Sequence, residues 1–344
     1  MNIADLEIEN YRSIKHLHVP NFRQFNLILG ENNSGKTSLL EAIQFCSGMP
    51  NGILLNQMNV IRRLMGNDIF TAFHDLDETK PISFSISKNR EKRKISVSSI
   101  KKQELTYNSR ESAQPNLNRV ANYIINVTRF DGKKYSVPYS PEQHIENPFY
   151  KPLADNEELQ NTDKSIPSFF WTPDWSTYNY SNALSKIIIN KKKDFIIKAL
   201  QEIDNNVQDI QLGANGGIFV DIGLQSLLPI PLMGQGIEKI LAIITTISNL
   251  ENGFVLIDEF ENGLHHTSME QLWSILFKLC KEQNIQLFVT THSYECIESF
   301  INKADNQSQL SIIRLERNID NTHTAVSISA EAAKQAIEQR WELR

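Results

Sequence analysis

Hydrophobic and polar positions along the 344-residue chain follow two periods, and these divide its first part into strands and a helix. Three short apolar runs between residues 6 and 29 predict three successive strands, the last of which ends on Gly30. Apolar side chains at helical spacing between Thr37 and Cys46 then predict a helix. The pattern therefore predicts a strand, a glycine-containing loop and a helix in direct succession.

The middle of the chain changes character. Residues that favour β-structure cluster between about 80 and 130 and predict an antiparallel subsheet. From 135 to 182, Pro, Asn, Ser and aromatic residues dominate, which indicates an irregular insertion or lid. We expect its aromatic cluster, 169–171 with Trp175, to form the core of that insertion. Apolar residues at helical spacing predict a helical part over 183–203.

The last part of the chain alternates short strands and helices, which predicts a mainly parallel sheet flanked by helices. We therefore divide the chain into an N-terminal half at 1–134, an insertion at 135–205 and a C-terminal half at 206–344. The predicted elements of the last part are strands near 208–222, a helix over 236–248, a strand over 254–257, a helix over 266–282, a strand over 286–290, a helix from Ser293, strands near 311–328 and a helix over 330–340.

The loop between the third strand and its helix has the sequence GENNSGKT, which matches G-x-x-x-x-G-K-[ST] in the required strand-to-helix context. Glycines let successive backbone N–H groups face a phosphate, and the helix N-terminus adds partial positive charge. Lys36 can reach the β- and γ-phosphates, and the Thr37 hydroxyl can ligate Mg²⁺. The predicted nucleotide-binding residues of this phosphate loop are Gly30, Asn32, Asn33, Ser34, Gly35, Lys36, Thr37 and Ser38.

Two carboxylates follow the apolar strand 254–257, at the sheet edge where open α/β sheets bind ligands. We expect Asp258 to hold Mg²⁺ and Glu259 to orient or deprotonate the attacking water. His292 follows the next strand and can donate a hydrogen bond to a γ-phosphate. Helix capping or core packing is the alternative role for His292.

A second glycine turn, Gly234-Gln235-Gly236, opens the predicted helix at 236–248. We call these three residues the signature turn. The helix N-terminus there is a second potential phosphate-binding end, this time without a lysine.

Together these motifs resemble the ABC-type ATPase heads of the SMC, RecF and OLD group, and most closely its bacterial AAA-family ATPases without a nuclease domain. The opening residues LEIENYRSI also look like the N-terminal strand and turn of that group, with Arg12 at the position of its arginine. The resemblance covers roughly 1–130 and 183–330. It implies a P-loop NTPase fold with an ABC-ATPase-like head and an antiparallel β-subdomain.

The resemblance also implies a mechanism. In such heads the signature turn of one subunit closes on ATP held by the other, so a homodimer has two composite sites with Arg12 near the nucleotide. The signature serine of the family falls at Leu232 or Met233 here, so we expect slow hydrolysis. For the family's Mg²⁺-sensing glutamine, Gln57 and His74 are the candidates and neither is favoured.

Composition limits the partners. The net charge of −5 gives no global positive field for DNA or an anionic membrane. The three cysteines have no C-x-x-C spacing, which favours a reducing compartment, and no apolar run is long enough to span a membrane. We expect a cytoplasmic protein. A local cluster of cations at a predicted hairpin tip suits nucleic-acid phosphates or, alternatively, a solvated turn: Lys88, Arg90, Lys92, Arg93 and Lys94.

These observations support one leading hypothesis: a cytoplasmic ATPase dimer that gates a partner protein. The family resemblance implies that this partner is an effector such as a nuclease or toxin, in bacterial antiphage defence. The alternative is a RecF-like or SMC-like clamp that closes on DNA. The sequence Asp75-Leu76-Asp77 imitates a nuclease D-x-D motif, and we predict a loop without catalytic function there.

Overall fold

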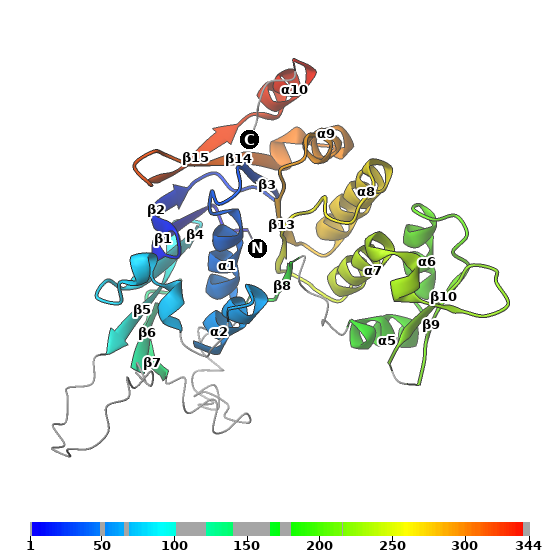
Figure 1. Cartoon of the computed structure of the whole chain (residues 1–344), viewed down its shortest axis with the longest axis horizontal. Coiled ribbons are helices and arrows are strands. Elements are labelled where there is room, and N and C mark those ends of the chain that lie inside the picture. The colour runs from blue at the N-terminus through cyan, green and yellow to red at the C-terminus, as the bar shows by residue number, and fades with distance from the viewer. Residues whose placement is uncertain are drawn as a thin grey trace, which may run out of the picture.

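The computed structural model describes residues 2–48, 52–64, 69–100, 122–139, 166–172, 180–214 and 216–339, and all structural statements concern these residues. Within them the chain forms two six-stranded sheets and a three-stranded sheet. Helix α1 (Lys36–Ser47) lies between the two large sheets (Figure 1). None of the described helices is both long and apolar enough to cross a membrane.

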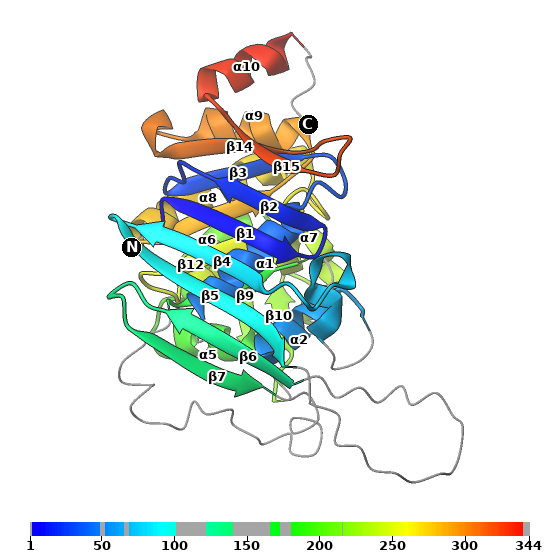
Figure 2. The same ribbon diagram turned by 90° about the vertical axis from the view of Figure 1, so that its left-hand side faces the viewer.

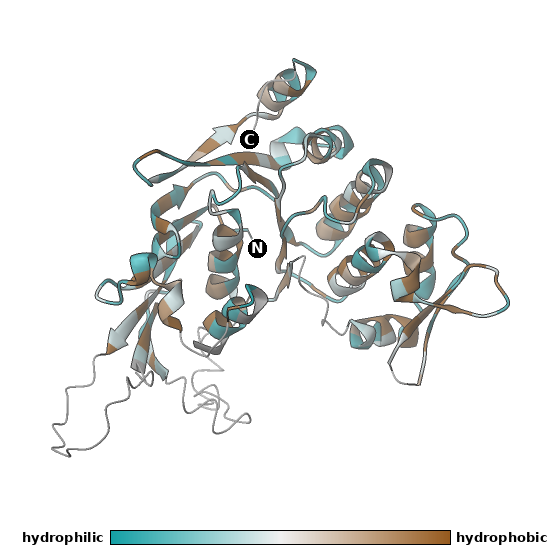
Figure 3. Cartoon of the chain, in the orientation of Figure 1, coloured by the Kyte–Doolittle hydropathy of each residue, from teal (hydrophilic) through white to brown (hydrophobic). Residues whose placement is uncertain are grey.

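The main sheet has the strand order β15-β14-β3-β13-β12-β8, and every neighbouring pair is parallel except β14 with β15. Its central strands are continuous apolar runs that are buried along their whole length, as expected of parallel strands covered on both faces (Figure 3). The strands are β3 (Phe25–Gly30), β8 (Ser168–Trp171), β12 (Phe254–Ile257), β13 (Gln286–Thr290), β14 (Leu310–Arg317) and β15 (His323–Ile328).

Alternate residues of these strands face two separate cores. Leu287 packs into the core under α7, α8 and α9, whereas Phe288 packs into the core around α1. Each such buried side chain contributes roughly 1.5–3 kcal/mol of stability.

The remaining helices are α2 (Gly52–Ile61), α5 (Ser181–Ile189), α6 (Lys193–Gln201), α7 (Gln235–Ile247), α8 (His266–Glu282), α9 (Tyr294–Lys303) and α10 (Ala330–Glu338), with 3₁₀ turns η1 (Ile69–Ala72), η2 (His74–Leu76), η3 (Ile230–Met233) and η4 (Gln307–Gln309).

The second large sheet is antiparallel and covers α1 from the other side, with the order β2-β1-β4-β5-β6-β7 (Figure 2). Phe84 of this sheet contacts Tyr11 edge-on and also meets Phe45 of α1. The first two strands of the chain therefore belong to this sheet. Its strands are β1 (Asp5–Tyr11), β2 (Ile14–Val19), β4 (Ile82–Lys88), β5 (Glu91–Ile100), β6 (Asn122–Thr128) and β7 (Lys134–Tyr139).

A small antiparallel sheet with the order β11-β10-β9 lies with α5 and α6 at the far end of the molecule, beyond α7 (Figure 1). Its strands are β9 (Asp209–Leu212), β10 (Ile218–Asp221) and β11 (Leu228–Pro229). These findings confirm the predicted α/β class, with a mainly parallel sheet flanked by helices and an antiparallel β-subdomain.

The helical part predicted over 183–203 is confirmed, and it consists of two helices with a break between them. Helix α5 ends at Ile189, and α6 begins only at Lys193. Lys191 between them has a φ of 56°, which a continuous right-handed helix does not allow. The residues 190–192 are Asn-Lys-Lys and are exposed, so no apolar side chain there would hold a helical turn against the core.

The interpretation of residues 169–171 as the core of an insertion is wrong. They form β8, an edge strand of the main sheet that pairs in parallel with β12. Phe169 and Phe170 are buried in the two different cores, so both faces of this strand are covered. The predicted boundary between 134 and 135 falls inside β7. Trp175 and residues 140–165 lie outside the described residues.

Candidate functional site

The phosphate loop joins the C-terminal end of β3 to the N-terminal end of α1. Gly30 has a φ of 148°, and a Cβ atom there would lie 2.5 Å from Ser34 Oγ and 2.6 Å from the carbonyl oxygen of Leu315. Gly35 has a φ of 95°, a conformation that other residues adopt only with strain. Glycine is therefore required at both positions for the loop to curl as it does.

Lys36 is the first residue of α1, and its side chain folds back into the loop. Its Nζ donates hydrogen bonds to the carbonyl oxygens of Gly30 at 2.7 Å and Glu31 at 2.9 Å. Burial lowers the pKa of Lys36, and the carboxylates of Asp258 and Glu259 act in the opposite direction. The lysine is thus held at the centre of the loop, where a phosphate would be the stronger partner for its charge.

Thr37 connects the phosphate loop to the end of β12. Its Oγ1 donates to Asp258 Oδ2 at 2.7 Å, while Thr290 Oγ1 donates to Asp258 Oδ1 at 2.5 Å. Burial raises the pKa of Asp258, and both hydroxyl hydrogen bonds oppose this rise. Hydroxyl and carboxylate oxygens are the ligands that Mg²⁺ prefers, so Thr37 and Asp258 fit that ion.

A cavity of about 320 Å³ opens above these residues. Most of the predicted site residues meet in its wall, although they come from four separate segments of the chain. Gly30 and Ser34 do not line the cavity. Ser34 is buried, and a Cβ atom at Gly30 would lie against its side chain. The cavity is lined by Arg12, Ser13, Asn32, Asn33, Gly35, Lys36, Thr37, Ser38, Arg62, Asp258 and Glu259.

Two arginines in this wall share one buried carboxylate, Glu41 of α1. Arg12 Nε lies 3.2 Å from Glu41 Oε2, and Arg62 Nε lies 2.7 Å from Glu41 Oε1. Arg62 also donates to Ser38 Oγ at 3.1 Å, and the Tyr11 hydroxyl donates to Glu41 at 2.9 Å. Sequence analysis missed Arg62 and Glu41, although an acid on the apolar face of a predicted helix was a usable signal.

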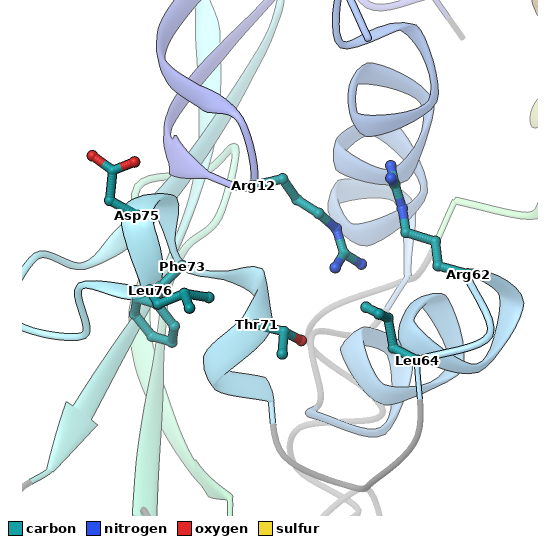
Figure 4. Close-up of a pocket in the computed structure, with 7 residues that line it drawn as sticks. All are labelled: Arg12, Arg62, Leu64, Thr71, Phe73, Asp75 and Leu76. Carbon is teal, nitrogen blue, oxygen red and sulfur yellow. The ribbon is translucent and has the colours of Figure 1, made fainter.

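A second cavity, of about 530 Å³, shares Arg12 and Arg62 with the first (Figure 4). Arg12, in the β1–β2 turn, and Arg62, directly after α2, lie on facing sides of this cavity. Its other walls are largely apolar, and they include two residues with left-handed backbone, Asp75 and Leu76. The wall is formed by Arg12, Arg62, Leu64, Thr71, Phe73, Asp75 and Leu76.

The Asp75-Leu76-Asp77 segment forms a turn, as predicted. The side chain of Asp75 is 82% exposed, and Asp77 accepts hydrogen bonds from Thr79 and pairs with Lys80 at 3.0 Å. Among the described residues, neither carboxylate belongs to a group of three or more potential metal ligands.

The turn after β12, residues 258–262, places its three acids differently. Asp258 faces the phosphate loop, and Glu259, with a φ of 49°, lines the first cavity while its carboxylate accepts from Asn262 Nδ2 at 2.5 Å. Glu261 turns to the next strand end, where it lies 2.8 Å from His292 Nδ1. His292 shares the sheet edge with Asp258 but lies outside the cavity wall. We call residues 258–262 the acidic turn.

Lys239 of α7 holds the acidic turn from below. Its Nζ donates to the carbonyl oxygens of Phe260 at 2.8 Å, Asn262 at 3.1 Å and Glu259 at 3.2 Å. Sequence analysis missed both Lys239 and Glu261. A lysine at a buried position of a predicted amphipathic helix was a signal for the first, and a third acid after the Asp-Glu pair was one for the second.

The signature turn lies apart from the cavity of its own chain. Gly234 and Gln235 are exposed, and Gly234 has a φ of 91°. Gly236 packs against the residue after the acidic turn, because a Cβ there would lie 2.6 Å from the carbonyl oxygen of Gly263. Of the two residues that fall at the position of the missing serine, Leu232 is 70% exposed and Met233 is partly buried.

The remaining predicted residues are scattered. Arg93 is buried and donates to the carbonyl oxygen of Gly48 at 3.2 Å, so its assignment to a surface cluster of cations is wrong. Lys92 and Lys94 stay exposed on either side of it, because successive side chains of β5 face opposite ways. Gln57 is exposed on α2, and neither it nor His74 lines either cavity.

This geometry defines a P-loop NTPase. A family profile described as "AAA domain, putative AbiEii toxin, Type IV TA system" matches residues 25–298, and the chain belongs to this family. The chain is therefore an ATPase of the AAA type.

Relatives of known description agree with this class. An "ATP/GTP phosphatase" from Helicobacter pylori is 26% identical over an alignment of 328 residues, and this alignment covers 86% of each chain. The DNA replication and repair protein RecF from Nitrosococcus oceani is 46% identical over 43 residues, 12% of each chain. The latter match is confined to a small part of both proteins.

Solved structures share the fold at low sequence identity. An Smc head bound to the C-winged helix domain of ScpA superposes with a TM-score of 0.50 at 16% identity, covering 97% of this chain and all of that one. A Pyrococcus furiosus Smc head with an extended coiled coil, bound to the C-terminal domain of ScpA, gives 0.51 at 14% identity, with 98% and 99% covered.

Proposed function

We propose that two copies of this chain bind and hydrolyse ATP between them, and that the cycle controls a partner effector in bacterial antiphage defence. The observation that carries the catalytic part is the hydrogen bond of 2.7 Å between Thr37 and Asp258 beside Lys36. It joins the phosphate loop and the acidic turn in one cavity. Phosphoryl transfer from a nucleoside triphosphate needs these two groups side by side.

Each residue has a distinct role in this proposal. The loop N–H groups and Lys36 bind the β- and γ-phosphates, and Thr37 and Asp258 hold Mg²⁺. Bound there, Mg²⁺ neutralises charge that develops on the phosphates. Glu259 takes the proton of the attacking water, and the cationic groups of Arg12 and Arg62 balance phosphate charge from the opposite wall.

The second cavity suits the nucleoside. It begins at the two arginines, so a nucleotide whose phosphates lie on the loop can extend its base past them (Figure 4). Leu64, Phe73 and Leu76 supply the apolar surface that a flat base packs against. Thr71 and Asp75 supply polar groups for its edge.

The dimeric part of the proposal rests on the signature turn. It is exposed and has no place in the cavity of its own chain, so a second copy would have to bring it to the nucleotide. Leu232 cannot supply the hydroxyl contact of the missing serine, which supports slow hydrolysis. The family description names a toxin–antitoxin system, and this supports an effector as partner. We place the protein in the cytoplasm.

The Glu259→Gln variant tests this function. Without a general base it should bind ATP and dimerise, yet hydrolyse at least about 100-fold more slowly than the wild type. Phosphate release and sedimentation velocity with and without ATP measure the two properties, and Glu251→Gln, an exposed carboxylate, is the matched control. Unaltered turnover, or an ATP-bound monomer, would overturn the corresponding part of the proposal.

A RecF-like or SMC-like clamp on DNA is the second candidate. The exposed Lys92 and Lys94, and the similarity to RecF and Smc heads, favour it. Fluorescence anisotropy with duplex and single-stranded DNA separates the two functions. ATP-dependent micromolar binding that Lys92→Glu and Lys94→Glu abolish supports the clamp, whereas no binding supports control of a protein effector.

A further inference from the structure

Glu261 makes contacts that neither the motif nor ATP binding requires. Its Oε2 accepts from Thr291 Oγ1 at 2.7 Å, and its Oε1 accepts from the backbone N–H of His292 at 2.8 Å. The same Oε1 lies 2.8 Å from His292 Nδ1. The Glu261 side chain is only 11% exposed, whereas that of His292 is 43% exposed. One shielded carboxylate therefore holds both the backbone and the ring of a side chain that reaches solvent.

We infer that Glu261 is a positioning residue for ATP hydrolysis, which sets the tautomer and orientation of His292. This inference rests on the proposed role of His292 at the γ-phosphate. A carboxylate that already accepts from a hydroxyl and from an N–H group acts as an acceptor, so the ring must carry its proton on Nδ1. The other nitrogen, Nε2, is then the atom free to turn towards a ligand at the sheet edge.

The carboxylate also decides what Nε2 can do. With a proton on Nδ1, a neutral imidazole can only accept at Nε2, whereas the imidazolium form donates there. A phosphate oxygen is an acceptor, so only the imidazolium form binds it. Glu261 holds Nδ1, so Nε2 on the opposite side of the ring is the atom that makes the phosphate contact.

The backbone that carries Glu261 is fixed on both sides. Lys239 Nζ donates to the carbonyl oxygens of Glu259, Phe260 and Asn262, which flank Glu261. The backbone N–H of Phe260 donates to the carbonyl oxygen of Thr290 at 3.0 Å. Because Glu259 lies in the same turn, one rigid segment places both the general base and the support of His292.

Glu261→Gln is the direct test, because it removes the charge and keeps the size of the side chain. We expect kcat to fall at least about 10-fold, from the size of general acid–base and orientation effects, with KM and ATP affinity unchanged. Glu261→Asp keeps the charge but is one methylene too short to reach both partners, so it should also be slow. Glu298→Gln, on the exposed side of α9, is the matched control with an unchanged rate.

The double variant separates positioning from folding. In the His292→Ala background, Glu261→Gln should cause no further loss of kcat, because both changes remove the same interaction. An equal loss in both backgrounds, or full kcat in both Glu261 variants while His292→Ala is slow, would overturn the inference. If His292→Ala itself keeps the wild-type rate, the proposed role of His292 is wrong instead.

Discussion

Lys239 carries a positive charge on the buried face of α7, where three carbonyl oxygens of the acidic turn accept its protons. Burial lowers its pKa to about 8, against the opposing effect of carboxylates that include Glu261 and Glu259. The neutral amine has two protons to donate, so it cannot satisfy all three carbonyls at once.

The titration of Lys239 predicts a pH-dependent stability. Its folded pKa of about 8 lies below the ordinary value of 10.5, so the unfolded chain binds more protons between these limits. The free energy of unfolding then rises with pH in this window, by at most about 1.4 kcal/mol per pH unit. In urea unfolding from about pH 7.5 to 10, the free energy of unfolding of the wild type should rise relative to that of Lys239→Met. A constant difference between the two proteins would contradict the lowered pKa.

Single residues differ in how far the sequence reveals them. The predicted residues Lys36, Thr37 and Asp258 do lie together, because a glycine loop and a strand end constrain where they go. Glu41 and Lys239 act through contacts with segments distant in sequence, and no local pattern names their partners. The sequence showed only that each was a charge at a buried helical position.

At the scale of elements, β8 shows where local patterns fail. It is four residues long and joins the main sheet at its edge beside β12, far away in sequence. Its aromatic residues matched a packed insertion equally well, because burial and hydrophobicity do not specify the partner strand. By contrast, β3, β12 and β13 were predicted correctly, since continuous apolar runs followed by chemistry-bearing residues are typical of parallel strands.

The contact between β8 and β12 gives a second stability prediction. Gly253, just before β12, approaches the chain so closely that a Cβ atom would lie 2.1 Å from the carbonyl oxygen of Pro167. Gly253→Ala should therefore push the β8 segment away and lower the free energy of unfolding by about 1–3 kcal/mol. Thermal unfolding followed by circular dichroism measures this.

Gly48→Ala is the control for that experiment. A Cβ atom at Gly48 would make an ordinary contact of 3.5 Å with Leu54, so stability should change by no more than about 0.5 kcal/mol. Equal effects of the two substitutions would show that the approach of β8 to β12 does not limit packing there.

At the scale of the molecule, the main sheet brings both ends of the chain into one site. Strand β3 lies between β14 and β13, so the phosphate loop of the N-terminal segment meets the acidic turn of the C-terminal segment, and His292 follows the neighbouring strand β13. Arg12, in the β1–β2 turn, lines the same cavity as the phosphate loop. This arrangement depends on strand order, which the sequence pattern alone did not specify.

Mixing two defective variants tests whether the active unit is a dimer of this chain. Lys36→Ala should lose ATP binding, and Gln235→Glu should place a carboxylate against the phosphates of the other copy, so each variant alone should be inactive. In a proposed symmetric dimer, a mixed pair keeps one intact site: the phosphate loop of the Gln235→Glu chain with the signature turn of the Lys36→Ala chain.

Random mixing makes about half of the dimers mixed, each with one of two sites intact, so the mixture should regain about a quarter of the wild-type rate per chain. The measurement is phosphate release after the variants are mixed at equal concentration, compared with each variant alone. Lys36→Ala mixed with the double variant Lys36→Ala/Gln235→Glu contains no intact phosphate loop and should stay inactive. A mixture of the two single variants that remains as inactive as this control would mean that the signature turn does not act across a dimer.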